Sequence, residues 1–420
     1  MTVGAATIAL MPRRRLVALV MAVSFAGSLG AGACSSFDSA AEPAPTLPEA
    51  SLEGSTTDPD ASDGAAGDAA PSRCEISTAS TAKPRVDCVG ADSVVDVNVS
   101  PLHCGRCGHN CLDAPCVGGL CSPQVIHSPG TSFVGDATAT HVFYTSGGDV
   151  QRSTVDGPPI VDVVARAASP GFFVRTFVRE DDRLFVVTSN SNFNEYGVVP
   201  SIASGDGGIT PLLTTTGGGL AADTHGLYFV SYASVFSVNK STGVQSTVQT
   251  NVEADEVRGL AGRDDEVYWT LVRAAPDGGT VEHLLFVRRA DGTVVERARD
   301  IGRPAGLALD ATHVYWADTQ TGSIMRALRA GTTAPTVVAR WPGTDRYVKA
   351  LLVAGATVYW TVSVDSQGGA DVTIYEAPTC AVGGSVTVTS HPGGEFNEGL
   401  VASTTHLYYG GLNGVYRAAR

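Results

Sequence analysis

The chain has 420 residues, of which 48 are glycine and 22 are proline, while only 7% are aromatic and 17% are charged. So much glycine and proline is typical of a turn-rich β protein and argues against a helical enzyme. The formal net charge of −14 argues against nucleic acid as a partner, because a nucleic-acid binder needs a basic face.

The first segment, residues 1–33, has the pattern of a signal peptide whose start is either the first methionine or Met11. Three consecutive arginines, 13–15, precede an apolar run over 16–29, and small residues follow it. A basic region, a short apolar run and small residues at the cut define a secretory signal. We therefore expect an exported protein.

The small residues that end in Cys34 resemble a bacterial lipobox. The resemblance implies acylation of Cys34 and attachment to lipid, and the Ser35 that follows implies sorting to the outer membrane. Acyl chains on one cysteine would anchor a protein that has no other membrane segment. Ordinary cleavage with release of a soluble product is the alternative.

Residues 34–73 contain the predicted lipidated cysteine followed by a linker with eight acids and a single base, Arg73. The linker has almost no large apolar side chains, and its charges repel one another. Such a segment cannot bury enough apolar surface to offset its ordering entropy. We predict a disordered acidic stalk.

Residues 74–122 form a cysteine-rich segment with seven cysteines, and an eighth lies far along the chain at Cys380. The run from Cys104 to Cys121 resembles the module of stigma-specific Stig1-like proteins, which also occurs in exported myxobacterial lipoproteins. A zinc site with His103 or His109 and a redox-active pair are the other interpretations. Export favours disulfides, because thiols then meet an oxidising compartment. The predicted disulfide cysteines are Cys74, Cys88, Cys104, Cys107, Cys111, Cys116, Cys121 and Cys380.

Cys380 has two interpretations. It either bridges to the cysteine-rich module, which brings the number of bridging cysteines to eight, or it remains an unpaired thiol packed as a small hydrophobic side chain.

Residues 123–420 contain an internal repeat whose anchor is a short apolar and aromatic strand. The anchors begin 40 to 49 residues apart and start at Val142, Leu184, Leu227, Val267, Val314, Val358 and Leu407. Several follow a Gly-Leu-Ala-like strand, and two more short strands come after most of them. Four strands in each of seven units predict an all-β, seven-bladed propeller.

The last unit ends after its third strand, and an additional strand is available at 124–127. We predict that N- and C-terminal strands close the ring together, which removes an exposed sheet edge. The segment from Val314 to Asp318, with Gly322 to Arg326, resembles the YWTD-type propeller repeat.

The loops before each inner strand and after each anchor strand should share one face of the propeller, around a central channel. Loops on a rigid scaffold are where function usually lies. The candidate binding residues at the channel mouth are Phe173, Glu256, Arg258, Arg303, Asp345, Arg346, Tyr347, Lys349, Glu395 and Glu398. Mixed charges and aromatic rings suit a protein, peptide or glycan ligand.

No catalytic motif is present, and no cofactor, metal or catalytic residue is predicted. His141, His225, His313 and His406 recur beside anchor strands, where capping of a turn is a better interpretation than metal binding. We therefore predict a non-enzymatic binding or scaffold protein of the outer membrane or cell surface. The alternatives are a lyase or hydrolase acting on a polysaccharide or small molecule, with His391 beside Glu395 or Glu398, and a purely structural surface protein.

Overall fold

The computed structural model describes residues 85–88, 94–127, 133–155, 161–166, 172–189, 194–199, 207–215, 218–231, 234–250, 256–273, 281–331, 333–341, 346–364, 372–380, 383–391, 396–411 and 413–420. The predicted signal peptide, Cys34, the acidic stalk and Cys74 lie outside these residues. Within the described part of the chain there is no helix with the length and apolar character needed to cross a membrane.

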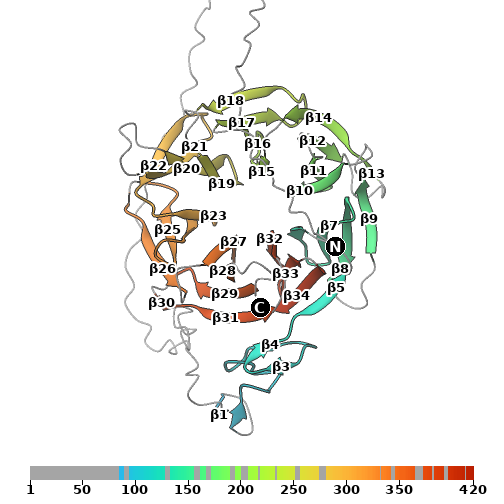
Figure 1. Cartoon of the computed structure of the whole chain (residues 1–420), viewed down its shortest axis with the longest axis vertical. Coiled ribbons are helices and arrows are strands. Elements are labelled where there is room, and N and C mark those ends of the chain that lie inside the picture. Colours follow the sequence, from blue (N-terminus) through green and yellow to red (C-terminus); the bar gives the residue numbers. More distant parts are fainter. Residues whose placement is uncertain are drawn as a thin grey trace, which may run out of the picture. The chain divides into compact units, whose positions relative to one another are not determined.

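Seven antiparallel sheets of four strands follow one another around a ring, as Figure 1 shows. The seven-bladed β-propeller predicted from the repeat is confirmed. We number the blades in chain order and call the first strand of each, which lies nearest the centre of the ring, its inner strand.

The first three blades are each built from four main strands. Blade 1 contains β6 (Val134–Ala137), β7 (His141–Ser146), β8 (Asp149–Thr154) and β9 (Val161–Arg166). Blade 2 contains β10 (Phe173–Glu180), β11 (Arg183–Ser189), β12 (Asn194–Val199) and β14 (Thr210–Thr215). Blade 3 contains β15 (Gly218–Ala222), β16 (Gly226–Ser231), β17 (Ser234–Asn239) and β18 (Gln245–Gln249).

The next three blades repeat this order. Blade 4 contains β19 (Glu256–Arg263), β20 (Glu266–Arg273), β21 (Glu282–Arg288) and β22 (Val294–Arg299). Blade 5 contains β23 (Pro304–Leu309), β24 (His313–Asp318), β25 (Ser323–Leu328) and β26 (Thr336–Arg340). Blade 6 contains β27 (Arg346–Ala354), β28 (Thr357–Val364), β29 (Val372–Pro378) and β31 (Val386–His391).

Blade 7 combines the two ends of the propeller. It contains β32 (Phe396–Ala402), β33 (His406–Gly411), β34 (Gly414–Ala419) and, as its outer strand, β5 (Gln124–His127). Val125 is the partner of Tyr416 in the antiparallel pair of β5 and β34. The predicted closure by N- and C-terminal strands is therefore confirmed, and Ile126 is buried in a cluster that includes Val142 and Val415.

The second strand of every blade forms the core because neighbouring blades cover both of its faces. Trp269, Trp316 and Trp360 occupy equivalent positions in blades 4, 5 and 6, and all three are fully buried. Their neighbours on either side are buried as well, so the alternation of a half-exposed strand is lost. This arrangement explains why the anchors are nearly continuous apolar runs.

The inner strands contact one another in sequence around the whole ring, from β6 through β10, β15, β19, β23, β27 and β32 back to β6. The last of these contacts is close. A Cβ atom on Gly399 of β32 would lie 2.4 Å from the carbonyl oxygen of Val134 in β6, which requires glycine at this position.

Cations at the end of the third strand join neighbouring blades. Arg329 of blade 5 donates hydrogen bonds to Glu266 and Asp264 of blade 4, each at 3.0 Å. Lys240 of blade 3 pairs with Glu180 of blade 2 in the same way. Arg288 and Arg420 make the equivalent contacts, to Asp223 and to the carbonyl oxygen of Ala354.

Two short parallel strands were not predicted from the repeat. Gly207–Gly208 (β13) leaves blade 2 and pairs with β9 of blade 1, while Gly383–Gly384 (β30) leaves blade 6 and pairs with β26 of blade 5. Each covers the outer edge of a neighbouring sheet, where unpaired backbone groups would otherwise be available for association.

The cysteine-rich module has two short hairpins, one from β1 (Arg85–Val86) and β2 (Val95–Asp96), the other from β3 (Cys116–Val117) and β4 (Leu120–Cys121). Its contacts reach blade 6: Thr389 donates a hydrogen bond to the carbonyl oxygen of Cys121 at 2.9 Å, and Arg106 forms an ion pair with Glu376.

Candidate functional site

The candidate residues that the structure describes lie where inner strands begin. We call this side of the ring the axial face. Phe173 begins β10, Glu256 and Arg258 begin β19, Arg303 directly precedes β23, and Tyr347 and Lys349 lie near the start of β27. Because the inner strands form a closed ring, the structure brings these residues of blades 2, 4, 5 and 6 to one side of the propeller.

The two aromatic residues of this set are exposed. The side chain of Phe173 is 45% exposed and that of Tyr347 is 50% exposed, whereas their neighbours Val174 and Val348 are buried between blades. Among the large hydrophobic side chains that are exposed in the described part of the chain, these two alone are aromatic. Two exposed rings at the starts of inner strands make this face a candidate contact surface.

The charged members of the set are also exposed. Arg258 donates a hydrogen bond to Glu256 at 2.9 Å along the edge of β19. An exposed pair of this kind contributes little to stability, and a ligand can replace either partner. No hydrogen bond or ion pair joins Lys349 to another described residue.

Asp318 fixes the backbone beside Arg303. Its buried carboxylate accepts a hydrogen bond from the backbone N–H of Arg303 at 2.9 Å and another from the hydroxyl of Thr321 at 2.6 Å. A Cβ atom on Gly302 would lie 2.2 Å from the Asp318 carboxyl carbon, so only glycine fits there. The aspartate of the Val314–Asp318 segment thus has a structural role at the axial face.

The remaining candidates cannot be placed in the site. Asp345 and Glu395 lie outside the described residues. Arg346 and Glu398 belong to β27 and β32, but their side chains, like that of His391 in β31, are outside the described part. The grouping of His391 with Glu395 or Glu398, on which the enzymatic alternative depends, therefore remains a hypothesis.

The recurring histidines lie at the turns between the first and second strands, away from the axial face. Nδ1 of His141 lies 2.9 Å from the hydroxyl of Thr140, and the same contact measures 2.7 Å at His313 and 2.9 Å at His406. His225 instead lies 3.5 Å from the carboxylate of Asp265. Burial lowers the pKa of His313, so its neutral form is favoured. The four residues belong to separate blades and take part in local turn contacts.

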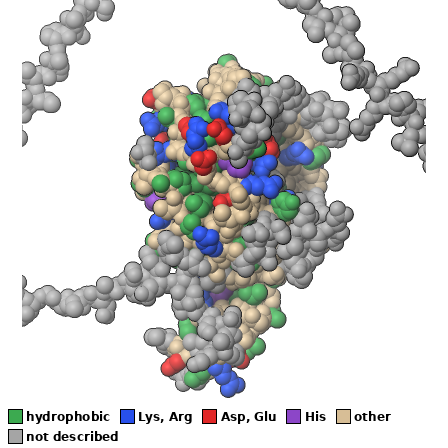
Figure 2. Space-filling view, turned by 60° about the vertical axis from the view of Figure 1, so that its left-hand side comes forward, with side chains coloured by type: hydrophobic (Ala, Val, Ile, Leu, Met, Phe, Trp, Pro, Cys, Tyr) green, Lys and Arg blue, Asp and Glu red, His purple; other side chains and the backbone are tan. Residues whose placement is uncertain are grey.

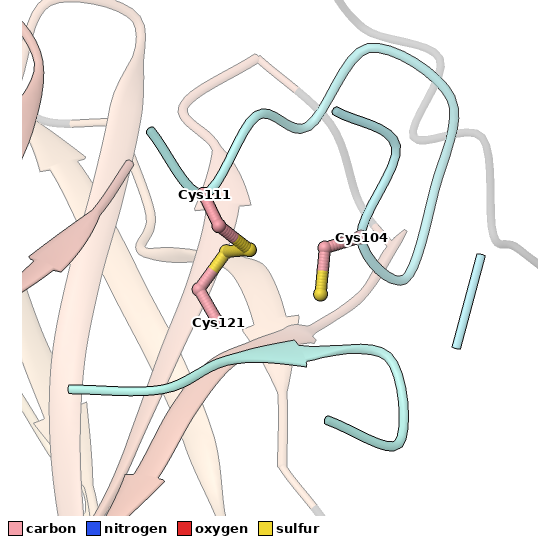
Figure 3. A group of neighbouring side chains, drawn as sticks. All are labelled: Cys104, Cys111 and Cys121. Atoms are coloured by element: carbon pink, nitrogen blue, oxygen red, sulfur yellow. A yellow bond between two sulfur atoms is a disulfide. The ribbon is translucent and has the colours of Figure 1, made fainter. Parts of the chain in front are cut away.

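Three sulfur atoms of the cysteine-rich module, those of Cys104, Cys111 and Cys121, lie within 4.8 Å of one another (Figure 3). Each belongs to a disulfide: the described pairs are Cys88–Cys107, Cys104–Cys116 and Cys111–Cys121. Sulfur in a disulfide is not the thiolate that zinc requires.

His109 is buried beside these disulfides, and its Nδ1 donates a hydrogen bond to the carbonyl oxygen of Cys104 at 2.7 Å. Burial, together with the nearby charge of Arg106, lowers the pKa of this imidazole. A neutral, hydrogen-bonded histidine completes the small core of the module. His103, the other histidine considered for zinc, accepts a hydrogen bond from the backbone N–H of Gly108 at 3.0 Å.

Cys380 is also disulfide-bonded. Its partner lies outside the described residues, which include no further cysteine. The sequence leaves Cys34 and Cys74 as the two cysteines available to it.

Arg175 is a candidate that sequence reasoning missed. It follows Phe173 by two residues on β10, is exposed, and has no hydrogen bond or ion pair with another described residue. The available signal is a three-residue pattern that recurs at the start of inner strands: Phe-Val-Arg at 173–175, Glu-Val-Arg at 256–258 and Tyr-Val-Lys at 347–349.

No protein-family model and no curated protein matches the chain. Among solved structures, a chain of a mitotic checkpoint complex is similar with a TM-score of 0.51 and 14% identity, over 80% of this chain and 97% of that one. The tricorn protease is similar with a TM-score of 0.51 and 11% identity, over 70% of this chain and 34% of that one. The WD40 propeller domain of Doa1 is similar at 13% identity with a TM-score of 0.46, over 71% and 97% of the two chains.

Identities this low show the fold alone, because unrelated functions occur on the same fold. The chain spans about a third of the tricorn protease, whose activity is not transferred to it. A propeller with exposed residues on one face is consistent with a binding or scaffold role.

Proposed function

We propose that the chain is an exported, lipid-anchored binding protein that holds a ligand on the axial face of its propeller. The observation that carries this proposal is the exposure of Phe173 and Tyr347 beside the charged residues of the same inner strands. Aromatic rings and arginines contribute most of the energy at protein binding sites. The same strands bury their intervening valines, so the exposed rings are a specific feature of this edge.

Binding of the purified full chain to glycan and peptide arrays tests the proposal. Phe173→Ala and Tyr347→Ala should each weaken binding by about tenfold or more, because each removes an aromatic contact of about 1.4 kcal/mol or more. Val244→Ala is the matched control, since Val244 is an exposed apolar residue at the turn that precedes β18, on the other side of the ring.

An unchanged melting temperature in all three variants would show that the fold is kept. Array binding that persists in both aromatic variants would contradict the choice of the axial face.

The proposed anchor is an acylated Cys34, supported by the basic, apolar and small-residue pattern that precedes it. We expect the wild-type protein to partition into the detergent phase of Triton X-114 extracts of a bacterial host and Cys34→Ser to remain in the aqueous phase. Ser35→Ala, one residue away, should behave like the wild type. Detergent partitioning of Cys34→Ser would contradict acylation at this residue.

A further inference from the structure

Every inner strand of the propeller carries a β-bulge near its start. In each blade, the register between the inner strand and the second strand shifts at one point. One or two residues of the inner strand at this point have no partner on the second strand. A bulge re-aims the side chain of its extra residue and is common beside functional sites. The extra residues are Gly135, Arg175, Gly219–Leu220, Arg258, Gly306, Lys349–Ala350 and Glu398–Gly399.

Cations occupy the bulges of alternate blades. Arg175, Arg258 and Lys349 are the bulged residues of blades 2, 4 and 6, whereas glycine stands at the bulges of blades 1, 3 and 5. All three cations are exposed. Each inner strand is covered by its own blade and by the two neighbouring inner strands, and the three cations lie near the starts of their strands, at the axial face.

Two of these three charges have no counterion among the described residues. Arg175 and Lys349 form no ion pair there, and Arg258 pairs with the exposed Glu256. On the outer wall, Arg299 pairs with both Glu282 and Glu296, whereas the exposed Arg340 forms no ion pair with a described residue. Figure 2, which brings the side with β22 forward, shows Lys or Arg and Asp or Glu side chains next to each other. The three axial cations lie on a chain whose net charge is −14.

An aromatic residue precedes two of the cations by two positions, and the side chains of both members of each pair are exposed. Phe173 and Arg175 form one such pair, and Tyr347 and Lys349 form the other. Guanidinium and ammonium groups bind carboxylates, and the flat apolar rings match the faces of sugar rings. Three cations on separate blades suit carboxylates that are spaced along a chain.

We propose that the axial face binds an acidic oligosaccharide, with Arg175, Arg258 and Lys349 as its carboxylate contacts and Phe173 and Tyr347 as its stacking surfaces. This inference rests on the proposed function and names the ligand class of the same site. It assigns Arg175 to the site and gives the bulges their role, which is to direct three cations toward one ligand.

Calorimetric titration of the full chain with oligogalacturonate tests the inference, and the methyl ester of the same oligomer is the neutral control. The acid should bind, the ester should bind at least about tenfold more weakly, and added salt should weaken binding of the acid. Arg175→Gln and Lys349→Gln should each raise the Kd about fivefold or more, because each removes a charged contact. Arg289→Gln is the matched control, an exposed arginine in the turn between β21 and β22.

Absence of oligogalacturonate binding, equal affinity for acid and ester, or unchanged affinity in the two cation variants would overturn the inference. Equally tight binding of oligoglutamate with the same dependence on Arg175 and Lys349 would overturn the saccharide assignment. If Tyr347→Ala weakens binding of an array ligand while the cation variants do not, the proposed function stands and this inference falls. If no ligand responds to the aromatic or the cation variants, both fall.

Discussion

At the scale of single residues, polar contacts between blades depend on cations that end the third strand. Arg329 is the most connected of them: its buried guanidinium bonds to Glu266, Asp264 and the carbonyl oxygen of Asp310. Burial opposes the charge, but the hydrogen bonds to the two carboxylates outweigh it and raise the pKa of Arg329. Each inter-blade contact of this kind fixes the turn of one blade to the next.

We expect Arg329→Ala to destabilise the protein by about 1–3 kcal/mol, because it removes the cation that bonds to both carboxylates and to the carbonyl oxygen of Asp310. Arg289→Ala should change stability by less than about 0.5 kcal/mol, since Arg289 is exposed in a turn. Thermal unfolding followed by tryptophan fluorescence measures the difference. Equal melting temperatures for the two variants would contradict the role given to Arg329.

These contacts could not be predicted from the sequence. The Arg329 guanidinium reaches a carboxylate 63 residues earlier in the chain, on a different blade, so no local pattern connects them. The threonines before His141, His313 and His406 are different, because a turn contact between adjacent residues follows from the dipeptide itself. Contacts between residues that are close in the chain can therefore be predicted from the sequence, and contacts between distant residues cannot.

At the scale of secondary-structure elements, the anchor strands were predictable because burial on both faces demands continuous apolar residues. Val314 to Trp316 and its equivalents identify one strand in every blade. The inner-strand bulges were not predicted, because a bulge is defined by the register between two strands and the register was not assigned from the sequence. The added strands β13 and β30 have two residues each and consist of glycine, which carries no strand signal.

Part of the candidate site was predictable from the pattern of strands in each blade. The positions before each inner strand follow from the blade pattern, which is how Phe173, Glu256 and Tyr347 were found. Arg175 lies within an inner strand and was not among the predicted site residues. The three-residue pattern that it shares with 256–258 and 347–349 is the sequence signal for it, and the pairing register adds that Arg175 has no partner on the second strand.

At the scale of the whole molecule, ring closure was predictable because the last unit of the repeat lacked a fourth strand. Strand β5 supplies it, and the closed ring of inner strands then places blades 2, 4 and 6 around one axis. The contact between the cysteine-rich module and blade 6 was not specified by any pattern, since Arg106 and Glu376 are 270 residues apart.

Hydroxyl-radical footprinting of the full chain with bound oligogalacturonate can locate the ligand on the propeller, because it reports which side chains the ligand covers. We expect Phe173 and Tyr347 to lose reactivity when the ligand binds, while Val244 and Leu328, which are exposed away from the axial face, keep theirs. Protection of Val117 and Leu102 in the cysteine-rich module, with Phe173 and Tyr347 still fully reactive, would contradict this expectation.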